Sequence, residues 1–348
     1  MQNESKKRNP TIDILRAFGI LLIVLAHTSL KNYNNGFLFV LFNARSFDVP
    51  LLIFVSGMSF SISNSEFYFD NNSYFKYALK RFKRIVLPSL IFVAIFLIYY
   101  LIIQNFLAID RLTVKYSLLS FSSFGGVGYI WICRVIFLLA ILSPFFKFVI
   151  SKIKNKIFVI VFIMVLYICN SVACYFFGGI DNVFIKILIV DTLLFTIGLS
   201  VPYLVGMIWC DLSLLLKAFV FSFFVSSFVA EMIIFRTFDL QLFKYPPYAL
   251  FLSFGLIISC SLYEIINYFM KSRPLYSWVS WLSKNSFNIY FVHIFFVFTF
   301  DSANILNDFW WLQYLIYISC SVLIVFLYLL LKKKNQERKK AICESDKG

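Results

Sequence analysis

Charged side chains are scarce in this sequence. Asp, Glu, Lys and Arg make up 14% of its 348 residues, whereas a soluble globular protein carries roughly a quarter. None of the seven cysteines has a neighbour at metal-ligand spacing, and all but Cys343 lie inside apolar runs, where cysteine behaves as a small hydrophobe. The composition therefore excludes an ordinary soluble domain, and we expect no metal cofactor.

Long apolar runs dominate what is present. The chain is 61% hydrophobic with a mean hydropathy of +0.84, and most of its ten apolar runs reach the ~20 residues that cross a bilayer core. Backbone groups cannot stay unpaired in lipid, so these runs must be helices. The sequence predicts an all-α, polytopic integral membrane bundle of about ten transmembrane helices. The expected spans are 12–30, 47–63, 85–103, 129–146, 157–177, 187–210, 214–235, 248–269, 282–300 and 310–331.

The basic residues predict the orientation of these spans. With a cytosolic N-terminus, 23 of the 32 Lys and Arg residues fall in cytosolic segments and seven in outer segments, which favours both termini inside the cell. We expect a cytosolic N-tail at 1–11, a membrane domain at 12–331 and a basic, disordered C-tail at 332–348. Because the positive charges form short clusters between apolar runs, the net charge of +15 indicates contacts with lipid headgroups rather than nucleic acid.

Only two histidines exist, and both lie within expected helices. Arg16 and His27 are eleven residues apart, or about three helical turns, so they share a face roughly 16 Å apart along the axis. Asp13 lies one turn before Arg16. Ionisable groups inside a membrane helix usually face an interior or a water-filled cavity, so we expect a functional polar stripe. The alternative is a snorkelling Arg16 and a packing His27.

A second polar face is expected on the helix at 282–300. Ser286, Tyr290 and His293 follow one another at helical spacing, which places them on one side. The alternative is a core histidine bonded to a backbone carbonyl. Glu231 lies near a helix end, where it is either interfacial or part of an outer cavity.

A basic cluster precedes the span at 85–103. Lys80, Arg81 and Arg84 lie at helical spacing, with Tyr77 on the same side. Such a cluster is either a cytosolic anchor of the helix or a cradle for the phosphates of a ligand. The spacing alone does not decide between them.

Several motifs, in this order, resemble the membrane acyltransferase-three family of bacterial enzymes that modify surface sugars. They are IDILRAFGILLIVLAHTS, FDVPLLIFVSGMSFS, RFKRIVLP, YIWICRVIFLLAILSP and SKNSFNIYFVHIFF, and the segment KYPPY is similar to members that act on polysaccharides. The resemblance covers residues 13–331 and implies a multi-pass protein of the bacterial inner membrane. The chain departs from the family pattern after Trp131, where Cys133 and Arg134 stand in place of an apolar pair.

The resemblance also implies roles for these residues. Acetyl-CoA would be the donor, and the acceptor would be a polysaccharide or a lipid-linked glycan. Arg81 and Arg84 would hold the phosphates of the donor with Lys80 assisting, while Arg16 would orient the pantetheine side or the phosphates. His27 would act as general base, since its ordinary pKa near 6.5 suits that role, or would carry the acetyl group itself. His293 would orient the acceptor or stabilise the oxyanion. The residues expected to contact substrate are Asp13, Tyr290, Ser286, Trp131 and Glu231.

Other classes of function stay open at this point. A transporter or flippase for a lipid-linked sugar or small anion would also contain intramembrane Arg and His, although we find no inverted repeat and no paired broken helices. A non-catalytic membrane partner in polymer assembly would not need polar stripes. The oligomeric state is not determined by the sequence, and a homo-oligomer fits the pattern as well as a monomer does.

Overall fold

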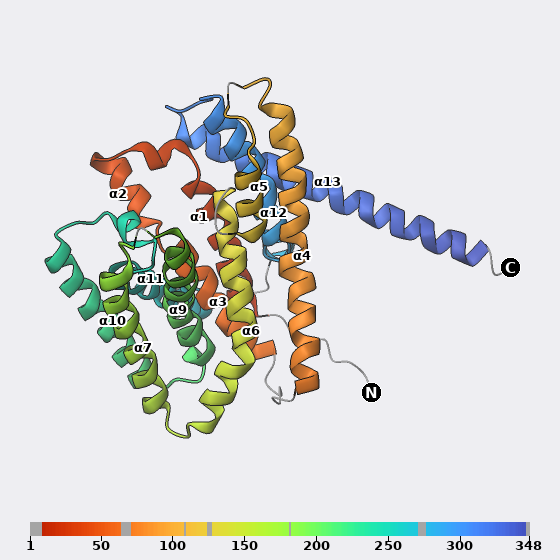
Figure 1. Cartoon of the computed structure of the whole chain (residues 1–348). Helices are drawn as coiled ribbons and strands as arrows, with labels where there is room; N and C mark the ends of the chain where they lie inside the picture. The colour runs from red at the N-terminus through yellow and green to blue at the C-terminus, as the bar shows by residue number, and fades with distance from the viewer. Residues whose placement is uncertain are drawn as a thin grey trace.

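The described structure consists of helices joined by short connections (Figure 1). It is a computed structural model that describes residues 9–63, 71–107, 109–123, 127–180, 182–270 and 276–345. No strand occurs within those ranges, which confirms the prediction of an all-α membrane bundle. Residues 1–8 of the expected N-tail, Lys271 and Arg273 of an expected cytosolic loop, and residues 346–348 lie outside the described residues.

The helices follow one another along the chain with these bounds. They are α1 (Pro10–Ala26), η1 (Ser29–Asn32), α2 (Gly36–Ala44), α3 (Asp48–Ser63), α4 (Asn71–Ile103), α5 (Val114–Ser122), η2 (Gly128–Ile130), α6 (Trp131–Lys152), α7 (Lys156–Phe177), α8 (Val183–Ile185), η3 (Lys186–Leu194), α9 (Phe195–Trp209), α10 (Leu214–Phe235), η4 (Leu240–Phe243), α11 (Ala249–Met270), α12 (Ser277–Ser302) and α13 (Trp310–Ser345). The η3 segment is a π-helix.

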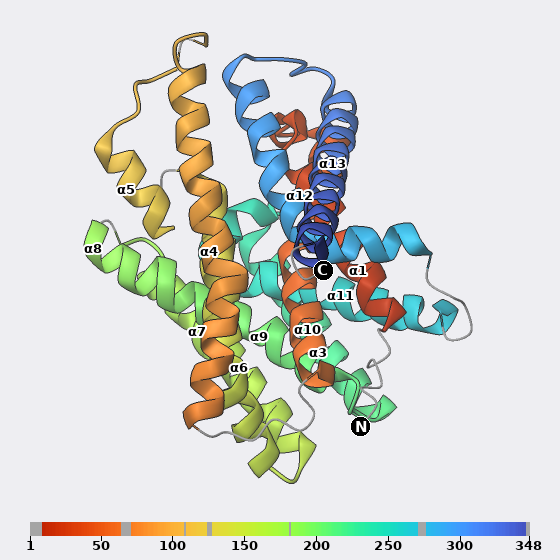
Figure 2. The ribbon, with the colours of Figure 1, turned by 90° about the vertical axis from the view of Figure 1, so that its right-hand side faces the viewer.

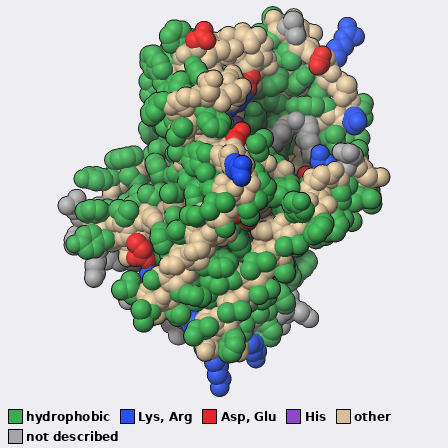
Figure 3. All heavy atoms as spheres, turned by 90° about the vertical axis from the view of Figure 1, so that its left-hand side faces the viewer, with side chains coloured by type: hydrophobic (Ala, Val, Ile, Leu, Met, Phe, Trp, Pro, Cys, Tyr) green, Lys and Arg blue, Asp and Glu red, His purple; other side chains and the backbone are tan. Residues whose placement is uncertain are grey.

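Eight helical segments of the described chain are long and apolar enough to cross a membrane. Hydrophobic side chains cover most of the face shown in Figure 3, as expected for a surface in contact with lipid. Of the ten expected spans, the first and the ninth correspond to α1, which has 17 residues, and to α12, and neither is among the eight. The number of ten spans and the orientation of the termini therefore stay predictions. Both helices carry the polar faces described above.

The centre of the bundle depends on a close crossing of α3 and α9. A Cβ atom on Gly57 would lie 2.0 Å from the carbonyl oxygen of Tyr203, and one on Gly206 would lie 2.1 Å from that of Phe54. Small residues let two membrane helices approach to backbone contact. Around this crossing, α1 packs against both α3 and α12, while α4 packs against α6 (Figure 2). These five helices line the site described below.

The tail of the chain differs from the sequence-based expectation. The expected disordered tail is wrong for the described residues, because α13 continues as a helix to Ser345 and projects from the bundle (Figure 1). Lys, Arg, Glu, Gln and Ala are strong helix formers, and Lys333 and Glu337 add an ion pair at i,i+4 spacing. The connection before α6 contains the short helix α5, whose first turn is capped by Thr113.

Candidate active site

A cavity of about 860 Å³ opens between α1, α3, α4, α6 and α12. Its volume falls within the range of small-molecule sites. Five cations line it against one carboxylate, that of Asp13, among the described residues. Walls of one charge sign concentrate ligands of the opposite sign, so the cavity suits an anionic ligand. The lining cations are Arg16, Lys80, Arg81, Arg84 and Lys284.

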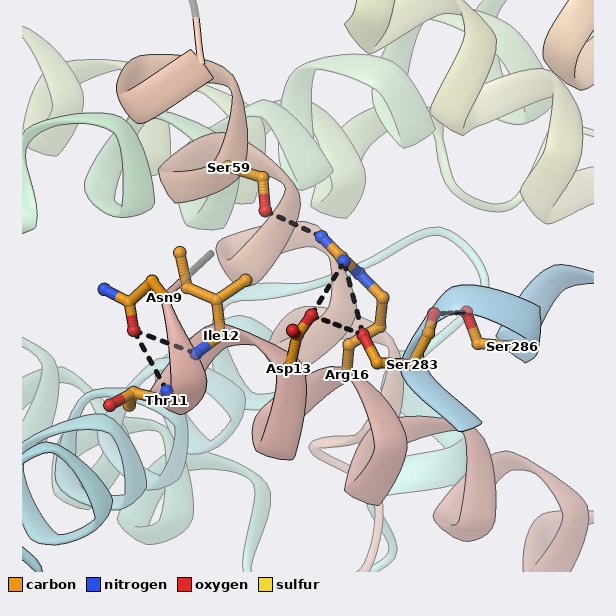
Figure 4. A network of polar contacts seen from close by, with 8 residues as sticks. All are labelled: Asn9, Thr11, Ile12, Asp13, Arg16, Ser59, Ser283 and Ser286. Carbon is orange, nitrogen blue, oxygen red and sulfur yellow. Dashed lines mark hydrogen bonds and ion pairs between the residues drawn. The ribbon is translucent and has the colours of Figure 1, made fainter. Parts of the chain in front are cut away.

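Arg16 is held at the edge of this cavity by groups from three helices (Figure 4). Its Nη2 donates to Ser59 Oγ of α3 at 2.7 Å, and its Nη1 lies 3.7 Å from Asp13 Oδ1 and 3.5 Å from Ser283 Oγ of α12. Ser283 Oγ in turn donates to Asp13 Oδ1 at 2.7 Å. The Arg16 side chain is 26% exposed while Asp13 is buried, so the guanidinium is fixed yet can still face a ligand.

The start of α1 explains why Asp13 and Arg16 lie here. Asn9 caps the helix, since its side chain accepts from the backbone N–H groups of Thr11 and Ile12, and Pro10 occupies the first helical position, where proline is favoured. Asp13 follows in the first turn, where a carboxylate is stabilised by the helix dipole.

The cations of α4 form the other wall. Arg81 lies over the Tyr77 ring at 4.8 Å, and Tyr77 Oη donates to the carbonyl of Ala140 on α6 at 3.0 Å. Lys80 and Arg84 flank Arg81 on the same wall, with exposed side chains. The ring contact orients one guanidinium, while the two exposed cations keep the freedom to adapt to a ligand.

The two histidines meet beyond the polar network of Asp13 and Arg16. The rings of His27 and His293 stack with centroids 5.4 Å apart and planes at 29°. His27 ends α1 and is half-buried, whereas His293 has 0% exposure and neither ring nitrogen makes a hydrogen bond of normal geometry within the described part of the chain. A buried polar group without a partner requires an explanation, and a substrate group would supply one.

Tyr129 completes the surroundings of His27. Its ring meets His27 edge-on at 4.4 Å, and its backbone carbonyl accepts a hydrogen bond from Tyr290 Oη. The Tyr290 ring also lies 5.3 Å from that of His293. Tyr290 therefore fixes the segment that holds Tyr129 against the imidazoles.

The structure distributes the sequence-predicted residues over two regions. The predicted residues that line the cavity are Asp13, Arg16, Lys80, Arg81, Arg84 and Ser286. A separate cluster farther along α1 and α12 contains His27, Tyr290 and His293, which are not among the residues that line the cavity. Trp131 contacts Phe195 and Tyr245 at 5.2 and 5.4 Å, and Glu231 is half-buried on α10; neither is among the residues that line the cavity.

Sequence reasoning missed three features of this region. Lys284 lines the cavity, although its position in the sequence is typical of a cytosolic anchor. Tyr129 contacts His27, although the sequence places it only at the start of an expected span. Arg45 and Asp48 form a fully buried ion pair at 2.8 Å, with 3% and 1% exposure of their side chains. Their i,i+3 spacing is the one signal that could have revealed this pair.

Comparison with known proteins agrees with the motifs. A family model described as an acyltransferase domain matches residues 9–330, which include the cavity and both histidines. No curated protein and no solved structure matches the chain.

Proposed function

Because the chain belongs to the acyltransferase-three family, we propose that this membrane acyltransferase moves an acetyl group from acetyl-CoA to a hydroxyl of a surface or exported polysaccharide, or of its lipid-linked repeat, in the bacterial inner membrane. The observation that carries the proposal is the cavity whose described wall holds five cations and one carboxylate, together with the stacked imidazoles at the end of α1 and on α12, two of the helices that line it.

The charges of the cavity match the chemistry of the donor. CoA carries three phosphate groups, and guanidinium groups bind phosphate through paired, charge-assisted hydrogen bonds. Arg81 and Arg84 project from α4 and Lys284 from α12, so the phosphates would be held between these two helices. Arg16 lies on α1, the helix that ends at His27, and would orient the arm that carries the thioester.

The imidazole pair supplies the acid–base chemistry. In the proposed step, a ring nitrogen of His27 takes the proton of the acceptor hydroxyl while that oxygen attacks the thioester carbonyl carbon. The carbon–sulfur bond then breaks, and the CoA thiolate leaves and takes up a proton. His27 suits the role of base because it is half-buried, whereas His293 is fully buried and would hold His27 or the developing oxyanion.

The donor phosphates and the reacting carbonyl would lie toward opposite ends of α1. Arg16 and His27 are about 16 Å apart along the helix, from its rise of 1.5 Å per residue. An extended pantetheine arm reaching inward from the cations would cover that separation. The acceptor would then approach His27 from the side of Tyr129 and Trp131, whose rings suit contact with a sugar face.

A transporter or flippase is the alternative that the same cavity favours, since a cation-lined hollow between membrane helices also suits a moving anion. Acetate bound to polymer separates the two. Cells with the intact protein should carry it, whereas cells without the protein and cells with His27→Ala should not, at equal amounts of membrane-inserted protein. Normal polymer acetylation by the His27→Ala protein would refute the proposed enzyme, and movement of a lipid-linked sugar without any acetyl donor would support the alternative.

A further inference from the structure

Lys244 is a buried cation without a counter-ion. The residue is 7% exposed. Its ammonium group lies 5.5 Å from the centre of the Tyr245 ring and makes no ion pair or hydrogen bond with the residues that the structure describes. The nearby cations differ from it, because Arg45 pairs with Asp48 at 2.8 Å and Lys31 pairs with Asp301 at 2.6 Å. A charge in a largely enclosed side chain is costly unless it is paired. The Lys244 Nζ atom is not among the fully enclosed polar atoms of the described residues, so the ammonium can receive a partner from outside the chain.

The loop that carries Lys244 is firmly attached. The backbone N–H of Leu240 donates to Asn43 Oδ1 at 2.8 Å, and the Gln241 side chain donates to Ser46 Oγ. On the far side, the carbonyl of Pro247 accepts from the Asn170 amide at 3.0 Å. The position of Lys244 is therefore set by the bundle.

This loop lies beside the histidines, apart from the cavity of the donor. The loop contacts Trp131, which follows two residues after Tyr129, and the Tyr129 ring meets His27. Lys244 is not among the residues that line the cavity. The next residue, Tyr245, is 53% exposed and contacts Trp131 at 5.4 Å. A cation and two aromatic rings therefore lie on the Tyr129 side of the proposed base.

We propose that the acceptor carries a negatively charged oxygen group, a carboxylate or a phosphate, close to the hydroxyl that receives the acyl group, and that Lys244 binds it while Trp131 and Tyr245 contact the sugar. This inference rests on the proposed function for the identity of the acceptor site. The charge arises either from an acidic sugar or from the diphosphate of a lipid carrier. Arg45 supports the assignment, because its buried Nε has no acceptor within the described residues.

Binding to the intact protein in phosphatidylcholine nanodiscs tests the inference without any transfer reaction. The probes are methyl glucuronide for an acidic sugar, decaprenyl diphosphate for a lipid carrier and methyl glucoside as the neutral reference. The protein should bind one of the two anionic probes at least 10-fold more tightly than the reference, and Lys244→Gln should remove that preference, since one charge-assisted bond is worth about that much. Lys244→Arg should restore most of it.

A matched control removes a cation elsewhere on the chain. Lys115 is exposed on α5, and Lys115→Gln should leave the preference unchanged. Acetyl-CoA binding by Lys244→Gln should equal that of the unchanged protein, which verifies folding. Equal binding of all three probes by the unchanged protein, or an unchanged preference in a folded Lys244→Gln protein, overturns the inference. Preferential binding in a protein that transfers no acetyl group supports the anion site and counts against the proposed function alone.

Discussion

Arg81 offers the sharpest test of the donor cavity. Its guanidinium lies 4.8 Å over the Tyr77 ring, and Tyr77 is tied to α6 through Ala140, so the charge is oriented toward the cavity before a ligand arrives. Replacing Arg81 by Gln removes one charge-assisted contact with phosphate, worth about 1.5–3 kcal/mol. Because Arg81 is partly exposed, solvent reduces this value. We therefore expect the Kd for acetyl-CoA to rise about 10-fold.

Arg81→Lys separates charge from geometry. The ammonium keeps the charge but loses the planar contact with Tyr77, which is worth about 0.5–1 kcal/mol, so the Kd should rise about 2–5-fold. Equilibrium titration of the purified protein at constant ionic strength measures both variants. S-Acetylpantetheine, which lacks the phosphates of CoA, should bind the unchanged protein and both variants equally.

Lys83 provides the matched control for Arg81. It is exposed on the same helix, two residues away, but is not among the residues that line the cavity. Lys83→Gln should leave the Kd for acetyl-CoA unchanged. The reasoning fails if Arg81→Gln and Lys83→Gln weaken binding equally, or if Arg81→Gln weakens S-acetylpantetheine as much as acetyl-CoA.

Two further predictions concern stability, measured by thermal unfolding of the purified protein. Gly57→Ala would place a methyl group 2.0 Å from the carbonyl oxygen of Tyr203 and should lower the free energy of unfolding by about 1–3 kcal/mol or more. Gly179→Ala, with open space around it, should lower it far less. Equal melting temperatures of the two variants would contradict the close crossing of α3 and α9. Arg45→Ala leaves the buried Asp48 carboxylate without its partner and should cost about 3–5 kcal/mol. The double change with Asp48→Ala should be less harmful than the sum of the single changes, and strict additivity would show that the two groups do not depend on each other.

The sequence predicts the class of fold because the physics of lipid leaves few options. Apolar runs of bilayer length can only be helices, and helical spacing shows which residues of one helix share a face. That reasoning groups Asp13 with Arg16, and Ser286 with His293. It does not show which faces meet, since the contact of His27 with His293 depends on how α1 and α12 pack, more than 250 residues apart in the chain.

The sequence predicts least about residues whose pattern fits two interpretations. A lysine near a cytosolic helix end, such as Lys284, is typical of a topology signal, and its approach to the cavity follows from tertiary packing alone. The sequence also does not show that Lys244 lacks an ion pair, because this depends on where the fold positions the acidic side chains. The basic composition of the tail predicts disorder, but its strong helix formers favour the helix that α13 continues to Ser345.

The central claim is that His27 performs the transfer chemistry while the cations of the cavity hold the donor. The most direct measurement compares donor binding and CoA release in one preparation of His27→Ala. The account predicts that this variant binds acetyl-CoA with the Kd of the unchanged protein but releases no CoA thiol in the presence of acceptor. Acceptor-dependent release of CoA at the normal rate by the folded variant would contradict it.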